Sequence, residues 1–187
     1  MDKFYLICCF LTYMKFKVIK RFIVIGLLSV AAVSNSSAQK SAAGNEAELY
    51  KVVENFRTSL IKKDKSLFLG LFLESNIGWQ SVTENESLAR IKVKQPKAVK
   101  VFVNPKDNYL SFIDFIVKDK KPIEETFANI KISTDGDVAF IGFDYVFLYD
   151  GRESNHGKEH WLLVRTENDW KITSVVWSET LPSAKSK

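Results

Sequence analysis

Four polar side chains in the last third of the chain have the residue types needed for acid–base or ligand-binding chemistry: Glu124, Thr126, Tyr145 and His160. A histidine can take up a proton near neutral pH, and a tyrosine can donate a hydrogen bond to a developing oxyanion. Brought together at the mouth of an apolar cavity, these side chains would form a ligand site. The plainer alternative is an outer row of a sheet, where Thr, Tyr and His are common.

The register of a predicted hairpin decides whether these residues meet. Asp135-Gly136 is a strong signal for a two-residue turn, and such a turn pairs residues whose numbers sum to about 271. Thr126 then lies opposite Tyr145, with Glu124 further along the same face. This face is apolar near the turn and becomes polar away from it.

The next strand, predicted over residues 158–166, could present either of two faces. If Leu162 shares the face of Tyr145, His160 completes the polar row, and Glu159 lies on the other face with Trp161. A slip of one residue in the preceding loop would exchange these two faces, because side chains alternate along a strand.

The opposite face of the predicted sheet is also partly apolar. Helices can cover only one face of a sheet, so an apolar outer face indicates a partner, most simply a second copy of the chain. We therefore predict a homodimer, with the interface residues Phe127, Asp144, Val146, Trp161 and Leu163.

We expect no metal and no cofactor. The two cysteines, Cys8 and Cys9, both lie near the N-terminus, outside the predicted domain. His156 and His160 are four residues apart, a spacing that converges on a helix but separates the side chains by about 13 Å on a strand.

The first 38 residues are predicted to be a secretory signal segment. A basic stretch is followed by the apolar run 22–33 and by the small residues Ser36-Ser37-Ala38, the order of a cleavable signal. Met14 is a possible true start, and a retained signal anchor is the alternative. We expect cleavage after Ala38, a periplasmic or extracellular location, and no stable membrane anchor afterwards.

The charge pattern argues against nucleic acid as a partner. The net charge is +5, but residues 1–38 contain five basic residues and one acidic residue, which leaves +1 for the rest of the chain. A basic surface of the kind that binds nucleic acid is therefore not expected after cleavage.

The remaining sequence predicts one domain over residues 46–180, between a flexible lead-in at 39–45 and a flexible tail at 181–187. The first helix carries an apolar stripe of Leu49, Val52, Val53, Phe56 and Leu60. Asp64 caps a short second helix, and Asn104 with Pro105 begins a third. Strands are predicted at 77–83, 124–133, 138–149, 158–166 and 170–178, with one or two edge strands within 88–103.

This order of elements resembles the nuclear transport factor 2-like (SnoaL-like) superfamily over residues 46–179. The most specific parts are Asp135–Ala139 before a long apolar strand, Trp161–Arg165, and Trp170-Lys171-Ile172 after an acidic turn. The resemblance implies an α+β, cystatin-like fold, in which a curved antiparallel sheet forms a cone-shaped roll around N-terminal helices. It also implies a range of activities, including isomerases, dehydratases, polyketide cyclases and subunit-association modules.

Two functions remain open at this point. Many members carry a histidine in the closing strand, but residues 172–178 contain neither histidine nor acid. We therefore favour an exported binding or accessory module that holds a small apolar or amphipathic ligand in the cone. The alternative is a cofactor-free isomerase, dehydratase or hydrolase that uses His160 with Tyr145 or Glu124.

Overall fold

The computed structural model describes residues 35–74 and 76–183, with backbone only for residues 35–45. The first helix, α1 (Asn35–Lys62), is followed by α2 (Lys65–Leu69), β1 (Gly78–Thr83), α3 (Asn85–Lys94) and α4 (Tyr109–Lys118). Four long strands complete the fold: β2 (Ile123–Thr134), β3 (Val138–Tyr149), β4 (Arg152–Arg165) and β5 (Trp170–Glu179). Residues 39–45, expected as a lead-in, belong to α1, and most of the predicted signal segment lies outside the described residues.

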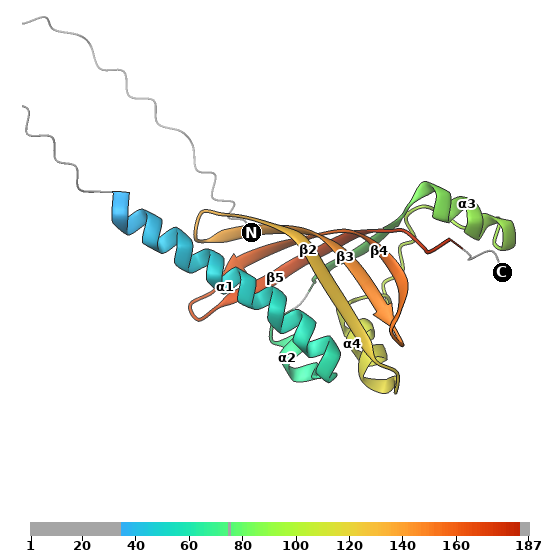
Figure 1. Ribbon diagram of the computed structural model, residues 1–187, viewed down its shortest axis with the longest axis horizontal. Helices are drawn as coiled ribbons and strands as arrows, with labels where there is room; N and C mark the ends of the chain where they lie inside the picture. Colours follow the sequence, from blue (N-terminus) through green and yellow to red (C-terminus); the bar gives the residue numbers. More distant parts are fainter. Residues whose placement is uncertain (1–34, 75, 184–187) are drawn as a thin grey trace, which may run out of the picture. The chain divides into compact units, whose positions relative to one another are not determined.

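The five strands form one curved sheet in the order β1-β5-β4-β3-β2. Strands β2 to β5 are antiparallel neighbours, and β1 joins the edge of β5 in parallel. Figure 1 shows α1 crossing the sheet and α2 and α4 at one end of it, while α3 stands apart. This arrangement confirms the predicted α+β fold with a curved sheet and N-terminal helices.

Helix α1 packs on the sheet through the apolar stripe predicted from its sequence. All five stripe residues are buried: Leu49, Val52, Val53, Phe56 and Leu60. Phe56 contacts the indole of Trp161 on β4, with ring centroids 4.9 Å apart. Burial of each such side chain contributes about 1.5–3 kcal/mol, so this contact layer anchors the helix.

The predicted edge strands within 88–103 are wrong. Residues 85–94 form α3, because the Glu84 carboxylate accepts hydrogen bonds from the backbone N–H groups of Glu86 and Ser87 and caps the helix. In the sequence, basic residues alternate with isoleucine and valine over residues 90–94, a pattern that is typical of an exposed strand. The third predicted helix also begins later, since Asn108 rather than Asn104 is its N-cap.

The β2–β3 register differs from the predicted one in two respects. The turn is longer, and its first paired residues are Thr134 and Ala139. A β-bulge follows between Ala128 and Lys131, with Asn129 in the left-handed region at φ 55°. Because a bulge adds one residue to one strand, it reverses which β2 side chains share a face with Tyr145.

Candidate functional site

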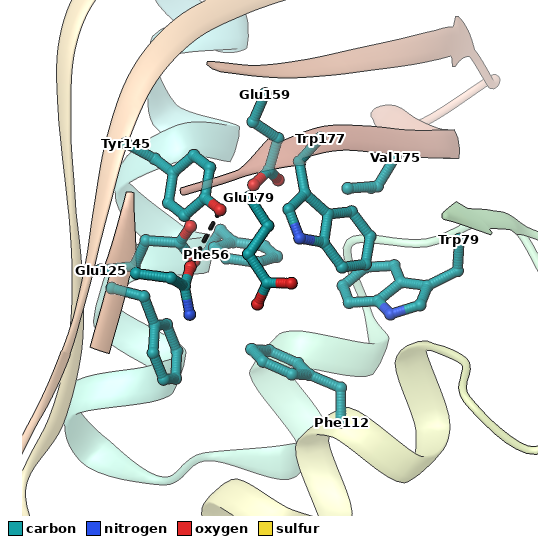
Figure 2. A pocket seen from close by; sticks show the side chains of 11 residues that line it. Phe56, Trp79, Phe112, Glu125, Tyr145, Glu159, Val175, Trp177 and Glu179 are labelled. Atoms are coloured by element: carbon teal, nitrogen blue, oxygen red, sulfur yellow. Dashed lines mark hydrogen bonds between the residues drawn. The ribbon is translucent and has the colours of Figure 1, made fainter. Parts of the chain in front are cut away.

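A cavity of about 200 Å³ lies inside the curve of the sheet, at the end closed by α4. Figure 2 shows side chains from both helices and strands converging on it. The lining combines aromatic rings with carboxyl groups, one phenol and one amide: Phe56, Trp79, Phe112, Glu125, Tyr145, Phe147, Asn155, Glu159, Val175, Trp177 and Glu179. The bulge in β2 directs Glu125 into this space, and the β3–β4 register directs Glu159 there from the neighbouring strand.

Glu125 and Glu159 form a buried carboxyl pair in the cavity wall. Each residue is only 4% exposed. The indole Nε1–H of Trp161 donates a hydrogen bond of 2.5 Å to Oε1 of Glu159. The two carboxyl groups interact, so the ionisation of each affects the pKa of the other.

The pair retains a proton at neutral pH. Burial, followed by the charge of Glu159, raises the pKa of Glu125 well above its ordinary value. Burial raises the pKa of Glu159 to about 7, while the hydrogen bonds from Trp161 and Glu125 limit that rise. Two interacting acids of this kind lose their protons in separate steps, so Glu125 remains a donor when Glu159 is ionised.

Tyr145 adds a third polar group that points into the same space (Figure 2). Its hydroxyl lies 2.9 Å from Oδ1 of Asn155 and 3.0 Å from the carbonyl oxygen of Ser178, and its single proton serves one of these acceptors at a time. Burial, and then the charge of Glu125, raise the pKa of the phenol, so Tyr145 stays protonated. Gly157 allows this approach of strands, because a Cβ there would lie 2.0 Å from the Ser178 carbonyl oxygen.

Aromatic rings and one further carboxyl group complete the lining of the cavity. The rings of Trp79 and Trp177 meet edge to face with centroids 5.3 Å apart, and Phe112 of α4 lies 5.4 Å from Trp79. Glu179, at the end of β5, points its carboxyl group between these rings (Figure 2). Burial raises the pKa of Glu179 above its ordinary value.

The cavity lining contains no lysine, arginine or histidine among the described residues. Within the same part of the chain, no group of three or more His, Cys, Asp or Glu side chains is arranged to hold a metal ion. None of the helices at residues 35–74 or 76–183 is long and apolar enough to span a membrane. The carboxyl groups and the phenol of the cavity can exchange protons and form hydrogen bonds.

Of the four predicted site residues, the structure brings only Tyr145 to the cavity. The predicted register is wrong beyond the bulge, so Glu124 and Thr126 point away from the cavity, and Glu124 pairs with Arg57 of α1 at 2.6 Å at the β2 edge of the sheet. His160 is on the outer face, stacked on Phe140 with ring centroids 5.2 Å apart. The structure adopts the alternative register of β4, in which a slip of one residue exchanges the two faces. Glu159 rather than His160 therefore shares the inner face with Tyr145.

The residues predicted for a dimer interface are divided between the two faces. Phe127, Trp161 and Leu163 pack in the core, because the bulge in β2 turns Phe127 inward and the slip of β4 turns Trp161 and Leu163 inward. Asp144 and Val146 do lie on the outer face. Asp144 is held there by hydrogen bonds from Lys158 and Asn129, which lower its pKa.

Four polar residues of the cavity were not predicted: Glu125, Asn155, Glu159 and Glu179. A signal for one of them was present, since Glu159 shares its alternation with Trp161 and Leu163, both fully buried. In a sequence, a charged residue that alternates with apolar residues along a strand is more often assigned to the solvent-exposed edge of the core than to a cavity inside it. Only the tertiary structure shows that this row turns into the cavity.

Comparison with known proteins identifies the fold. No family model and no curated protein matches the chain. An NTF2-like protein with a cystatin-like fold from Novosphingobium aromaticivorans aligns with a TM-score of 0.57 at 12% identity, covering 83% of this chain and 95% of that one. A candidate scytalone dehydratase from the same bacterium gives 0.54 at 12% identity, covering 76% and 89% of the two chains.

A third solved structure, a candidate dehydratase of the NTF2-like family from Streptomyces avermitilis, also gives a TM-score of 0.54. Its identity is 14%, over 75% of this chain and 99% of that one. Similarities at this level of identity reflect the shared architecture, and the activities of such folds vary. The chain therefore has the cystatin-like fold of the nuclear transport factor 2-like proteins.

Proposed function

We propose that this protein is a small-molecule-binding module whose ligand occupies the cavity beside Glu125, Tyr145 and Glu159. The observation that carries the proposal is the combination of an apolar, aromatic lining with a few convergent polar groups, the usual composition of ligand pockets. A cavity of about 150 Å³ accommodates benzene. The volume of about 200 Å³ here suits a single substituted ring.

Native mass spectrometry of the protein purified from its own host tests this proposal. A co-purifying small molecule should be present in the wild type and absent from Val175→Phe, which fills the cavity from its wall. Val176→Phe is the matched control, because Val176 is 41% exposed on the other face. Retention of the molecule by Val175→Phe, with the fold intact by circular dichroism, would contradict the proposed site.

The carboxyl pair supports a second candidate function, a cofactor-free isomerase or dehydratase. A general base works best when its pKa is near the operating pH, and the pKa of Glu159 is about 7. Neutral Glu125 and the Tyr145 phenol could donate hydrogen bonds to an oxygen that gains charge. Two of the similar structures are candidate dehydratases, which is consistent with this function without assigning it.

One substitution separates the two functions. Glu159→Gln should change ligand affinity by no more than about tenfold in a binding module, because apolar burial supplies most of the energy. General acid–base catalysis should lose on the order of 10²–10⁴ in rate from the same change. His160→Gln, on the outer face, is the control and should affect neither quantity.

We also propose that the module acts outside the cytoplasm. The basic–apolar–small order of the first 38 residues supports export. The intact mass of protein recovered from periplasm or medium should correspond to a chain that begins at Gln39. A full-length product found only in the membrane fraction would contradict this location.

A further inference from the structure

We propose that the ligand of this cavity is an organic cation: a protonated amine attached to a small ring or a short apolar chain. This inference rests on the proposed function and gives that function a chemical class. The inference is supported by the carboxyl groups and the aromatic rings that line the cavity.

Three carboxyl groups line the cavity: those of Glu125, Glu159 and Glu179. Within the described residues, the lining supplies no basic side chain to any of them, and Glu159 receives its hydrogen bonds from neutral donors. A buried carboxylate that lacks a cationic partner is costly. A bound ammonium group would supply that partner and would hydrogen-bond to more than one carboxyl oxygen.

The aromatic side chains suit the same ligand. Trp79 and Trp177, with Phe112 beside them, place rings on the side of the cavity away from Glu125, and Trp177 is paired with Glu159 across the β4–β5 ladder (Figure 2). Cations are attracted to the faces of such rings, most strongly to tryptophan, and water-excluded sites strengthen the effect. A neutral ligand would use only the apolar area, and an anion would be repelled by the carboxylates.

Cation binding should also be linked to the protonation of the cavity. The groups facing Glu159 are Glu125 from β2, Tyr145 from β3 and Glu179 from β5, and none of them can carry a positive charge. Since the pKa of Glu159 is about 7, a cation should bind more tightly at pH 8 than at pH 6, by up to roughly tenfold. A neutral ligand of the same shape should not show this increase.

Calorimetry with three probes of one shape tests the inference: benzylammonium, benzyl alcohol and benzoate. We expect benzylammonium to bind at least about tenfold more tightly than benzyl alcohol at pH 8, and benzoate to be weakest. Glu159→Gln and Glu179→Gln should reduce the preference for the cation to a few-fold without weakening benzyl alcohol. The matched control is Glu153→Gln on the same strand as Glu159, where Glu153 pairs with His156 at 2.7 Å on the surface.

The outcomes distinguish this inference from the proposed function. Equal binding of the amine and the alcohol would overturn the cation preference and leave a binding cavity. Failure of all three probes at millimolar concentration would overturn both. If a glutamine variant does not fold, the pH dependence of benzylammonium binding to the wild type decides, and affinity that is flat between pH 6 and pH 8 overturns the inference.

Discussion

The two ends of the sheet's inner face differ sharply, although the same strands build both. Near the β2–β3 turn, Ile141, Leu163 and Ile172 are at most 1% exposed and belong to the same core as the apolar stripe of α1. At the α4 end, the same alternation of side chains presents glutamates and a tyrosine to a cavity. The change occurs within two residues of β4, from Trp161 to Glu159, which are joined by a hydrogen bond.

This contrast shows how one sheet separates stability from binding. The packed end has apolar side chains in contact on all sides, and interiors of this kind tolerate little change in volume. The cavity end buries acids that raise the energy of the folded state when they are ionised. We infer that the packed end stabilises the fold enough to compensate for the energetic cost of burying these carboxyl groups at the cavity end.

The largest effect is expected from Trp161→Ala, which removes the side chain where the two ends meet. Trp161 is fully buried and contacts Phe56 and Phe143. We expect the free energy of unfolding to fall by about 3–5 kcal/mol in urea denaturation. A loss below about 1 kcal/mol would show that the packed end does not depend on this ring.

At the cavity end, Glu159→Gln should raise the free energy of unfolding, whereas Trp161→Ala lowers it at the packed end. The pKa of Glu159 is about 7 in the folded chain against an ordinary 4.5, so the folded state binds more protons between these values. The wild type should therefore lose stability as pH rises from about 4.5 to 7, and the variant should lose less over the same range. The variant should gain roughly 3 kcal/mol at pH 8 and little at pH 4, measured by denaturation at both pH values.

His160→Gln is the control for this measurement, because His160 lies outside the cavity. Its unfolding free energy should follow that of the wild type at pH 8. A Glu159→Gln variant no more stable than the wild type at pH 8 would show that the carboxyl pair is not a source of instability.

The outer face extends the comparison to the other side of the same strands. Phe140 and Leu162 are 37% and 53% exposed there, next to Val138 and Val176. If the proposed homodimer uses this face, Leu162→Glu should raise the dimer dissociation constant at least tenfold, because it buries an unpaired charge. Sedimentation at tens of micromolar measures this, with Ser66→Glu, at an exposed position on α2, as control; a wild-type monomer would contradict the dimer.

The smallest effect is expected for Tyr145→Phe, which tests one polar contact of the cavity. Loss of the hydroxyl leaves Asn155 and the Ser178 carbonyl without this partner, at a cost of about 1–2 kcal/mol. Tyr149→Phe removes an exposed hydroxyl bonded to Asp119 and should cost less than about 0.5 kcal/mol. Thermal unfolding of both variants compares them, and equal shifts would contradict a special role for Tyr145.

The sequence was sufficient for the fold because its strongest patterns are local. The stripe of α1, from Leu49 to Leu60, is buried as predicted, and the long strands occur close to their predicted positions. The fold class followed from the order of these elements. Helix α3 was missed because Lys92, Val93 and Lys94 alternate as an edge strand would.

The site could not be predicted because it depends on register. Both faces of β3 and β4 contain apolar residues, so the alternation alone does not show which face is inside. The bulge at Asn129 then moved Glu125 inward and Thr126 outward. No glycine marks this bulge, and the left-handed conformation of Asn129 is visible only in the structure.

The close contact of Gly157 with Ser178 restricts how this protein can vary. Any other residue at this position would place an atom against the Ser178 carbonyl oxygen, which is also an acceptor for Tyr145. In a library of single substitutions, position 157 should therefore accept almost nothing but glycine, whereas the neighbouring exposed Lys158 should accept most residues. During evolution, a substitution of Gly157 would persist only with a second, compensating substitution in β5, the strand that contains Ser178.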